Sequence, residues 1–139
     1  MSQITLHPTL SKDCQVVTEL SASTVLLMND AQYPWLILVP NRPDLTDLDQ
    51  LSTADMVLVQ YDIRRACKVL RQLFSPTKLN VASLGNMVPQ LHIHVIARFD
   101  SDPAWPKPVW GVLPAKPYTQ EALQQSVQQL KQAFDEVVD

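Results

Sequence analysis

One long amphipathic segment constrains the fold of this chain more than any other feature. From Thr53 to Phe74, apolar residues recur every three or four positions, which is the period of an α-helix that buries one face. Ser52 precedes the segment as a candidate N-cap, Asp55 follows three positions later as in a capping box, and Pro76 ends the pattern. The sequence therefore predicts a helix that needs an apolar partner surface. Its apolar positions are Met56, Val59, Ile63, Cys67, Leu70 and Phe74.

That partner surface is predicted to be a β-sheet. Short segments rich in branched aliphatic residues lie before and after the helix, and turn residues bound each of them. The short connections between the first three favour antiparallel neighbours. The segments are "CQVVTEL" from Cys14, "STVLLMND" from Ser23, "WLILVP" from Trp35, "KLNVASLGN" from Lys78 and "QLHIHVIARF" from Gln90.

The last part of the chain contains a proline-rich segment followed by a second amphipathic segment. Residues 100–117 hold too many prolines for a helix or a central strand. A second amphipathic helix is then predicted from about Thr119 to Val138. Together these elements predict an α+β fold in a single domain over residues 1–139, long enough to bury one core without disulfides. The apolar stripe of the second helix is Leu123, Val127, Leu130, Phe134 and Val137.

Composition narrows the cellular setting and the classes of partner. The formal charge of −3 argues against a protein that binds duplex nucleic acid, which needs a large basic surface. No apolar run approaches the ~20 residues that cross a bilayer, and the start "MSQITLHPTL" lacks the layout of a signal peptide. Cys14 and Cys67 are too few and too far apart for a disulfide framework, so we expect free, mostly buried thiols. We therefore expect a cytoplasmic protein with no nucleic-acid or membrane partner.

The candidate site is the segment "QLHIHVIAR", residues 90–98, which holds two of the three histidines. Alternate side chains of a strand point to opposite faces, so Gln90, His92 and His94 share one face while the opposite face is entirely apolar. This alternation predicts that the histidines occupy the less buried face. Imidazoles two positions apart are separated by about 6.6 Å along a strand, which suits one phosphate-sized group.

Three interpretations of the histidine pair are open from the residues alone. The two are ordinary polar residues of a strand, ligands of a metal ion, or a nucleophilic site. A metal needs three or four protein ligands, and beyond the pair the chain offers only His7, Asp100, Asp102 or a more distant residue. A neutral imidazole, in contrast, is a competent nucleophile near pH 7 without a metal, provided that an acceptor such as a backbone carbonyl holds its other N–H.

The wider segment favours the nucleophilic interpretation. "GNMVPQLHIHVIAR" resembles the signature of the histidine triad (HIT) superfamily, in which three histidines alternate with apolar residues and a glycine lies five residues before the first. Gly85 has that spacing before Gln90. The resemblance covers about residues 14–99. It implies a HIT-like fold, with a five-stranded antiparallel sheet, one long helix and a C-terminal helix, and it implies a homodimer. The apolar positions of the signature are filled by Leu91, Ile93, Val95 and Ile96.

The resemblance assigns roles to the two histidines. In the family the middle histidine, here His92, attacks the α-phosphate of a nucleotide derivative and forms a nucleotidyl-histidine that water hydrolyses. His94 is similar to the histidine that hydrogen-bonds phosphate oxygens and the bridging atom. The implied function is a nucleotide hydrolase or transferase that acts on a dinucleoside polyphosphate, such as a diadenosine polyphosphate, or on a nucleoside phosphoramidate. The resemblance implies no required cofactor. It allows a divalent metal but does not indicate one.

Other residues resemble the nucleotide contacts of the family. Asn80 is similar to an amide residue on the neighbouring strand that contacts ribose or phosphate, and either Asn29 or Asp30 resembles the polar residue that binds ribose hydroxyls. Backbone N–H groups near Gly85 to Met87 are expected to face the charge that develops on phosphate oxygens. The expected substrate contacts are Asn29, Asp30, Asn80, Gly85, Asn86 and Met87.

Departures from the family pattern open a second function. Gln90 stands in place of the first histidine, which supports the site without attacking phosphorus, so we expect activity with altered geometry or pH dependence. Met87 stands where many members have Ser or Thr, and Asn86 where they have Gln. Because a thioether is a poor hydrogen-bond partner, assistance to the leaving group is weakened. The second function is a nucleotide-binding regulatory protein with little turnover.

The proline-rich segment carries two tryptophans with two open interpretations. In the first interpretation, Trp105 or Trp110 stacks on a base or closes the site of a partner subunit. In the second, both tryptophans only pack the segment onto the protein surface. His7, near the start of the chain, is interpreted as incidental.

Overall fold

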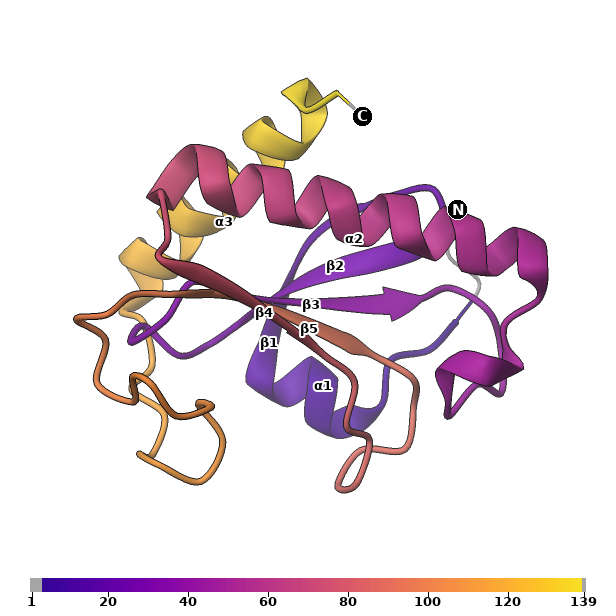
Figure 1. Ribbon diagram of the computed structural model, residues 1–139, viewed down its shortest axis with the longest axis horizontal. Helices are drawn as coiled ribbons and strands as arrows, with labels where there is room; N and C mark the ends of the chain where they lie inside the picture. The colour runs from indigo at the N-terminus through magenta and orange to yellow at the C-terminus, as the bar shows by residue number, and fades with distance from the viewer. Residues whose placement is uncertain (1–3, 139) are drawn as a thin grey trace.

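Five strands form one antiparallel sheet in the computed structural model, which describes residues 4–138 (Figure 1). The strand order is β1-β2-β3-β5-β4, so β3 and β5 are direct neighbours although α2 and β4 separate them in the sequence. This is the antiparallel α+β architecture that the sequence predicts. The strands are β1 (Cys14–Glu19), β2 (Ser23–Met28), β3 (Trp35–Pro40), β4 (Lys78–Ala82) and β5 (Ile93–Arg98).

The long helix α2 spans Thr53–Phe74, as predicted. Ser52 caps it by accepting a hydrogen bond from the Asp55 N–H at 3.1 Å. The chain leaves the helix at Ser75, whose φ of 49° lies in the left-handed region that commonly ends helices. A short 3₁₀ turn, η1 (Leu48–Gln50), leads into the helix.

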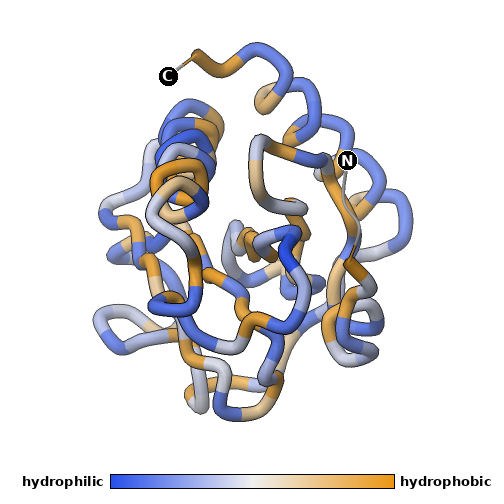
Figure 2. Tube along the Cα trace, turned by 90° about the vertical axis from the view of Figure 1, so that its right-hand side faces the viewer, coloured by the Kyte–Doolittle hydropathy of each residue, from blue (hydrophilic) through white to orange (hydrophobic). Residues whose placement is uncertain are grey.

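The C-terminal helix α3 spans Gln120–Glu136 and lies on the same face of the sheet as α2 (Figure 1). Thr119 caps it by accepting from the Ala122 N–H at 3.2 Å. Hydrophilic and hydrophobic residues alternate along the traces of the helices (Figure 2), and the apolar stripes of both meet one core on the sheet. No helix within residues 4–138 is long and apolar enough to span a bilayer.

The opposite face of the sheet is covered as well, which the sequence does not predict. The short helix α1 (Pro8–Asp13) and the proline-rich residues 100–117 lie on this face (Figure 1), over a second apolar core that includes Ile96 of β5. All of β5 is therefore buried. The prediction that His92 and His94 occupy a less buried face is wrong, because each is only 6% exposed.

Two strand boundaries also differ from the prediction. The strand expected from Gln90 begins at Ile93, and the strand expected through Asn86 ends at Ala82. Gly85, with a φ of 76°, and a proline at position 89 break the extended backbone between them. His92 consequently lies at the end of a loop, one residue before β5, and His94 lies inside the strand.

Arg98 fastens the proline-rich segment to the sheet. Residues 100–117 form neither helix nor strand, as predicted. The guanidinium of Arg98 donates to both carboxylate oxygens of Asp102, at 2.8 and 3.1 Å, and to the Lys107 carbonyl at 2.8 Å. A further N–H donates to the Asn80 side-chain oxygen at 2.8 Å. The side chains of Arg98 and Asp102 are 1% and 3% exposed, so each depends on the other for charge compensation.

We predict that Arg98→Met lowers the free energy of unfolding by about 3–5 kcal/mol, because the Asp102 carboxylate is left buried without its counter-charge. Urea unfolding measures the loss. Arg42→Met is the matched control, since the pair of Arg42 with Asp55 is 35% and 24% exposed and an exposed pair contributes about 0–1 kcal/mol. Equal small losses in the two variants would contradict the role assigned to Arg98.

Candidate active site

His92 and His94 line a mostly apolar cavity of about 350 Å³. Ligand pockets commonly enclose about 300–1,000 Å³, so the cavity has room for a small ligand. Gly85, Asn86 and Met87, in the loop after β4, also line the cavity. The structure thus brings together five of the residues that the sequence predicts for the site. The apolar part of the lining includes Leu10, Met28, Trp35, Ile37, Val88 and Trp110.

The backbone holds His92 in one tautomer. Its Nδ1 lies 2.6 Å from the carbonyl oxygen of Gln90. A carbonyl oxygen only accepts hydrogen bonds, so Nδ1 carries the proton and the Nε2 of the neutral ring keeps its lone pair. This is the backbone acceptor that a nucleophilic imidazole requires.

A tryptophan on the neighbouring strand holds His94 in the opposite tautomer. The indole N–H of Trp35 donates to His94 Nδ1 at 3.0 Å. Because an indole N–H can only donate, Nδ1 is unprotonated and the proton of the neutral ring lies on Nε2. Burial of the ring, with a smaller contribution from His92, lowers the pKa of His94 from 6.5 to about 4. His94 is therefore an uncharged hydrogen-bond donor at neutral pH.

The indole rings of Trp35 and Trp110 pack against His94 of the histidine pair. The centroids of the His92 and His94 rings lie 4.9 Å apart, at an interplanar angle of 71°. Trp110 meets His94 edge-on at 5.0 Å and Trp35 edge-on at 5.9 Å. The His94 ring packs against two indole rings and the His92 ring, so its tautomer is held by packing as well as by its hydrogen bond.

The model of one protein family, the HIT domain, matches residues 9–101. The chain belongs to the HIT domain family. Histidine triad protein blr8122 from Bradyrhizobium japonicum is 39% identical over 94% of this chain and 97% of its own, with a TM-score of 0.90. A histidine triad protein from Marinobacter aquaeolei VT8 is 38% identical over 96% of this chain and 98% of its own, with a TM-score of 0.91.

A more distant structural neighbour has the same fold. It is the Plasmodium falciparum diadenosine triphosphate hydrolase in complex with cyclomarin A, which is 17% identical over 87% of this chain and 76% of its own, with a TM-score of 0.67. No match was found among curated proteins.

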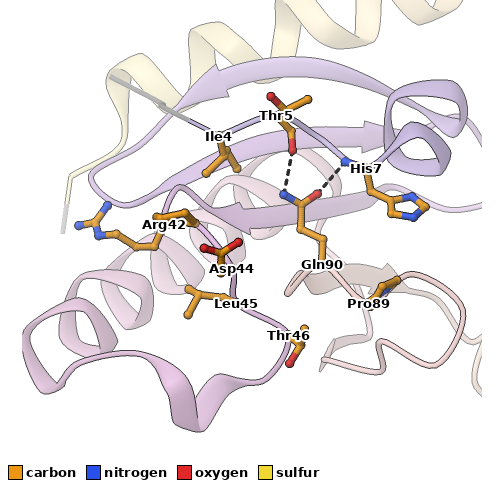
Figure 3. Close-up of a pocket in the computed structure, with 10 residues that line it drawn as sticks. Ile4, Thr5, His7, Arg42, Asp44, Leu45, Thr46, Pro89 and Gln90 are labelled. Atoms are coloured by element: carbon orange, nitrogen blue, oxygen red, sulfur yellow. Dashed lines mark hydrogen bonds between the residues drawn. The ribbon is translucent and has the colours of Figure 1, made fainter.

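In this HIT protein the side chain of Gln90 points away from the histidine cavity. Its carboxamide oxygen accepts from the His7 N–H at 2.7 Å, and its Nε2 donates to the Thr5 carbonyl at 3.1 Å. Figure 3 shows the carboxamide between Thr5 and His7, across from the loop that carries Leu45 and Thr46. The contact borders a separate hollow of about 600 Å³, which neither His92 nor His94 lines. Gln90 thus serves the histidine site with its backbone carbonyl and the N-terminal segment with its side chain.

His7 is not incidental, since it joins this contact to the cavity wall. Its Nδ1 accepts from the Thr9 N–H at 3.1 Å and so caps α1. Thr9, Leu10 and Asp13 of α1 line the histidine cavity. Gln90 therefore anchors the segment that positions one wall of the site.

The structure does not bring Asn29, Asp30 and Asn80 to the cavity. Asn29 accepts from the Tyr118 N–H at 2.9 Å, and the buried Asp30 accepts from the backbone and side-chain amides of Gln32 at 3.1 and 3.0 Å. The Asn80 side-chain oxygen is bound to Arg98. Asn29 and Asp30 thus bind residues of connecting segments, whereas Asn80 joins β4 to Arg98 of β5.

The two tryptophans of the proline-rich segment have different places. Trp110 lines the histidine cavity of its own chain. The guanidinium of Arg98 lies 5.8 Å from the ring centroid of Trp105, so that ring belongs to the anchor of the segment.

Sequence reasoning missed two parts of the site. The contribution of Trp35 depends on the pairing of β3 with β5, for which the sequence gives no local signal. Helix α1 has one usable signal, because His7 followed by Pro8 matches an N-cap followed by proline at the first helical position. Among residues 4–138 no three His, Cys, Asp or Glu side chains come together as metal ligands do.

We predict that Gln90→Ala speeds hydrogen exchange of the His7 amide, because both side-chain hydrogen bonds to the N-terminal segment are lost. The loss of two such bonds corresponds to about 1–3 kcal/mol. Gln90→Glu is the matched control, since its carboxylate keeps an acceptor for the His7 N–H and lacks the donor to Thr5. Exchange that is equally fast in the wild type and in Gln90→Ala would refute the anchoring role.

Proposed function

We propose that this HIT protein is a nucleotide hydrolase or transferase that cleaves at the α-phosphate of a dinucleoside polyphosphate or a nucleoside phosphoramidate through a nucleotidyl-His92 intermediate. The observation that carries the proposal is the 2.6 Å contact between His92 Nδ1 and the Gln90 carbonyl. It leaves an unprotonated Nε2 on a ring that lines a ligand-sized cavity. Such a nitrogen is suited to attack phosphorus.

In the first step, Nε2 of His92 forms a bond to the α-phosphorus while the bond from phosphorus to the leaving group breaks and its electron pair departs with that group. The ring becomes positively charged, and the Gln90 carbonyl stabilises the charge through Nδ1–H. The Nε2–H of His94 donates to a phosphate oxygen or to the bridging atom. Backbone N–H groups at Gly85 to Met87 are the other donors proposed for the phosphate.

In the second step, water attacks the phosphorus and the bond to His92 Nε2 breaks. The nucleoside monophosphate leaves, the proton lost by water passes to solvent, and His92 returns to its neutral form. The apolar wall formed by residues such as Leu10 and Met28 suits a base. A structural neighbour that is a diadenosine triphosphate hydrolase supports the choice of dinucleoside polyphosphates as candidate substrates.

A nucleotide-binding regulatory role is the second candidate. Met87 is 92% exposed, and the carboxamide of Gln90 is occupied by the N-terminal segment. These two positions therefore give the leaving group little assistance. In this role the same cavity holds a nucleotide and turns it over slowly.

The proposal includes no required cofactor, since attack and charge stabilisation are both assigned to side chains and backbone. It places the protein in the reducing cytoplasm, where the two cysteines, both free in the structure, are stable as thiols.

We predict that brief exposure to diadenosine tetraphosphate places an adenylyl group on His92, which mass spectrometry of peptides detects. His92→Ala should form no adduct and release no AMP, and a chelator should leave the wild-type rate unchanged. Peptides of the wild-type protein that contain His7 are the internal control and should carry no adenylyl group, since the ring of His7 does not line the cavity. Tight nucleotide binding by the wild type without adduct or turnover would reject the enzyme in favour of the regulatory role.

We also propose a homodimer in which β4 pairs with its copy. β4 is an edge strand of the sheet, and its Val81 is 48% exposed. Light scattering should then give twice the chain mass of 15.7 kDa. Val81→Lys should shift the protein to monomer, whereas Val16→Lys on the opposite edge strand β1, where Val16 is 46% exposed, should not. A wild-type monomer at all concentrations would refute the dimer.

A further inference from the structure

We propose that Trp35, by fixing His94 as a neutral donor, directs this site toward substrates whose leaving group departs as an anion, a phosphate or a carboxylate, and away from those that release an amine. The inference rests on the function proposed above and narrows its substrate class. The observation behind it is the indole N–H of Trp35, which donates to His94 Nδ1 at 3.0 Å. The two substrate classes differ in whether the leaving group must receive a proton from the site.

An amine leaving group needs a proton from the site. When the bond between phosphorus and nitrogen breaks, the electron pair goes to nitrogen, and an amide anion is far too basic to leave without a proton. A general acid must therefore deliver one, which contributes about 10²–10⁴-fold to such a rate. A phosphate or carboxylate leaving group takes the electron pair as a stable anion, so a hydrogen bond to the bridging oxygen is sufficient.

His94 cannot act as that acid while Trp35 is in place. To become an imidazolium, the ring would have to take a proton on Nδ1, and two N–H groups would then face each other across 3.0 Å. Both rings are buried, with exposed fractions of 5% for Trp35 and 6% for His94, so water cannot replace the lost hydrogen bond. Burial also holds the pKa of His94 down, to about 4. The neutral ring donates a hydrogen bond from Nε2 and keeps its proton.

The other titratable groups of the cavity do not supply the proton. Of the described residues that line it, Asp13, Cys14, His92 and His94 titrate. Burial first, and then Asp13, raise the pKa of the Cys14 thiol to about 12, so that it is a weak acid. Asp13 presents a carboxylate, which accepts hydrogen bonds. His92 is the nucleophile, and its one proton is held by the Gln90 carbonyl.

The test compares an anhydride with an amidate of the same nucleotide. The wild-type kcat/KM is measured for diadenosine tetraphosphate and for adenosine phosphoramidate. We expect the anhydride to be preferred by about 10²-fold or more, the lower bound of a missing general acid. Equal rates, or a preference for the amidate, would overturn the inference. The absence of both turnover and adduct would instead refute the proposed enzyme and the inference with it, and the tautomer of His94 is a second, independent test of the inference.

That tautomer is read by nitrogen NMR of the wild-type protein labelled at histidine. We expect His94 to carry its proton on Nε2 at every pH from about 8 down to about 5. A proton on Nδ1, or an imidazolium in this range, would overturn the inference whatever the substrate.

Trp35→Phe keeps the aromatic ring and removes the N–H. We expect the ratio of amidate to anhydride kcat/KM to rise about tenfold or more as His94 becomes able to accept a proton, with the largest rise at acid pH. Trp110→Phe is the matched control, because Trp110 contacts His94 through its ring and not at Nδ1. Its ratio should stay that of the wild type. If both variants change the ratio equally, the effect is one of cavity shape and the inference is refuted.

Discussion

The pairing of β3 with β5 is the constraint on which the rest of the site depends. In this register Ile37 lies opposite His94, and Trp35 lies opposite Ile96. Trp35 and Ile37 therefore share a face with the histidine, and the indole reaches across the strand boundary to Nδ1. A slip of one residue would turn Trp35 to the helix-covered face and remove the donor. Both strands have a partner on each side, so the register is held by three strand pairs.

This dependence explains what the sequence could and could not predict. Helix α2 was predictable to the residue because its period, its cap at Ser52 and its end before Pro76 are all local signals. The burial of His92 and His94 was not, because the elements that cover them, α1 and residues 100–117, have no period of their own. Strand alternation identifies which residues share a face, but the elements that cover the face come from distant parts of the chain.

The backbone and the side chain of Gln90 have separate partners. The group that orients His92 is the backbone carbonyl of Gln90, which any residue would supply. The side chain is thereby released for another task, and here it fastens Thr5 and His7. The sequence contains no signal for the direction in which the Gln90 carboxamide points, because Thr5 and His7, its partners, lie more than 80 residues away along the chain.

Strand β5 also links the chemistry of the site to the stability of the fold. Its residues His94, Ile96 and Arg98 lie on one face, so the first lines the cavity while the last holds the Lys107 carbonyl, three residues before Trp110. Trp110 lies beyond residues 9–101, the part that matches the HIT domain, yet it closes the cavity against His94. The wall that encloses the histidines is therefore held by a buried ion pair at the other end of the same strand. Because Lys107 and Trp110 belong to the same segment, loss of that anchor loosens one wall of the cavity as well as the fold.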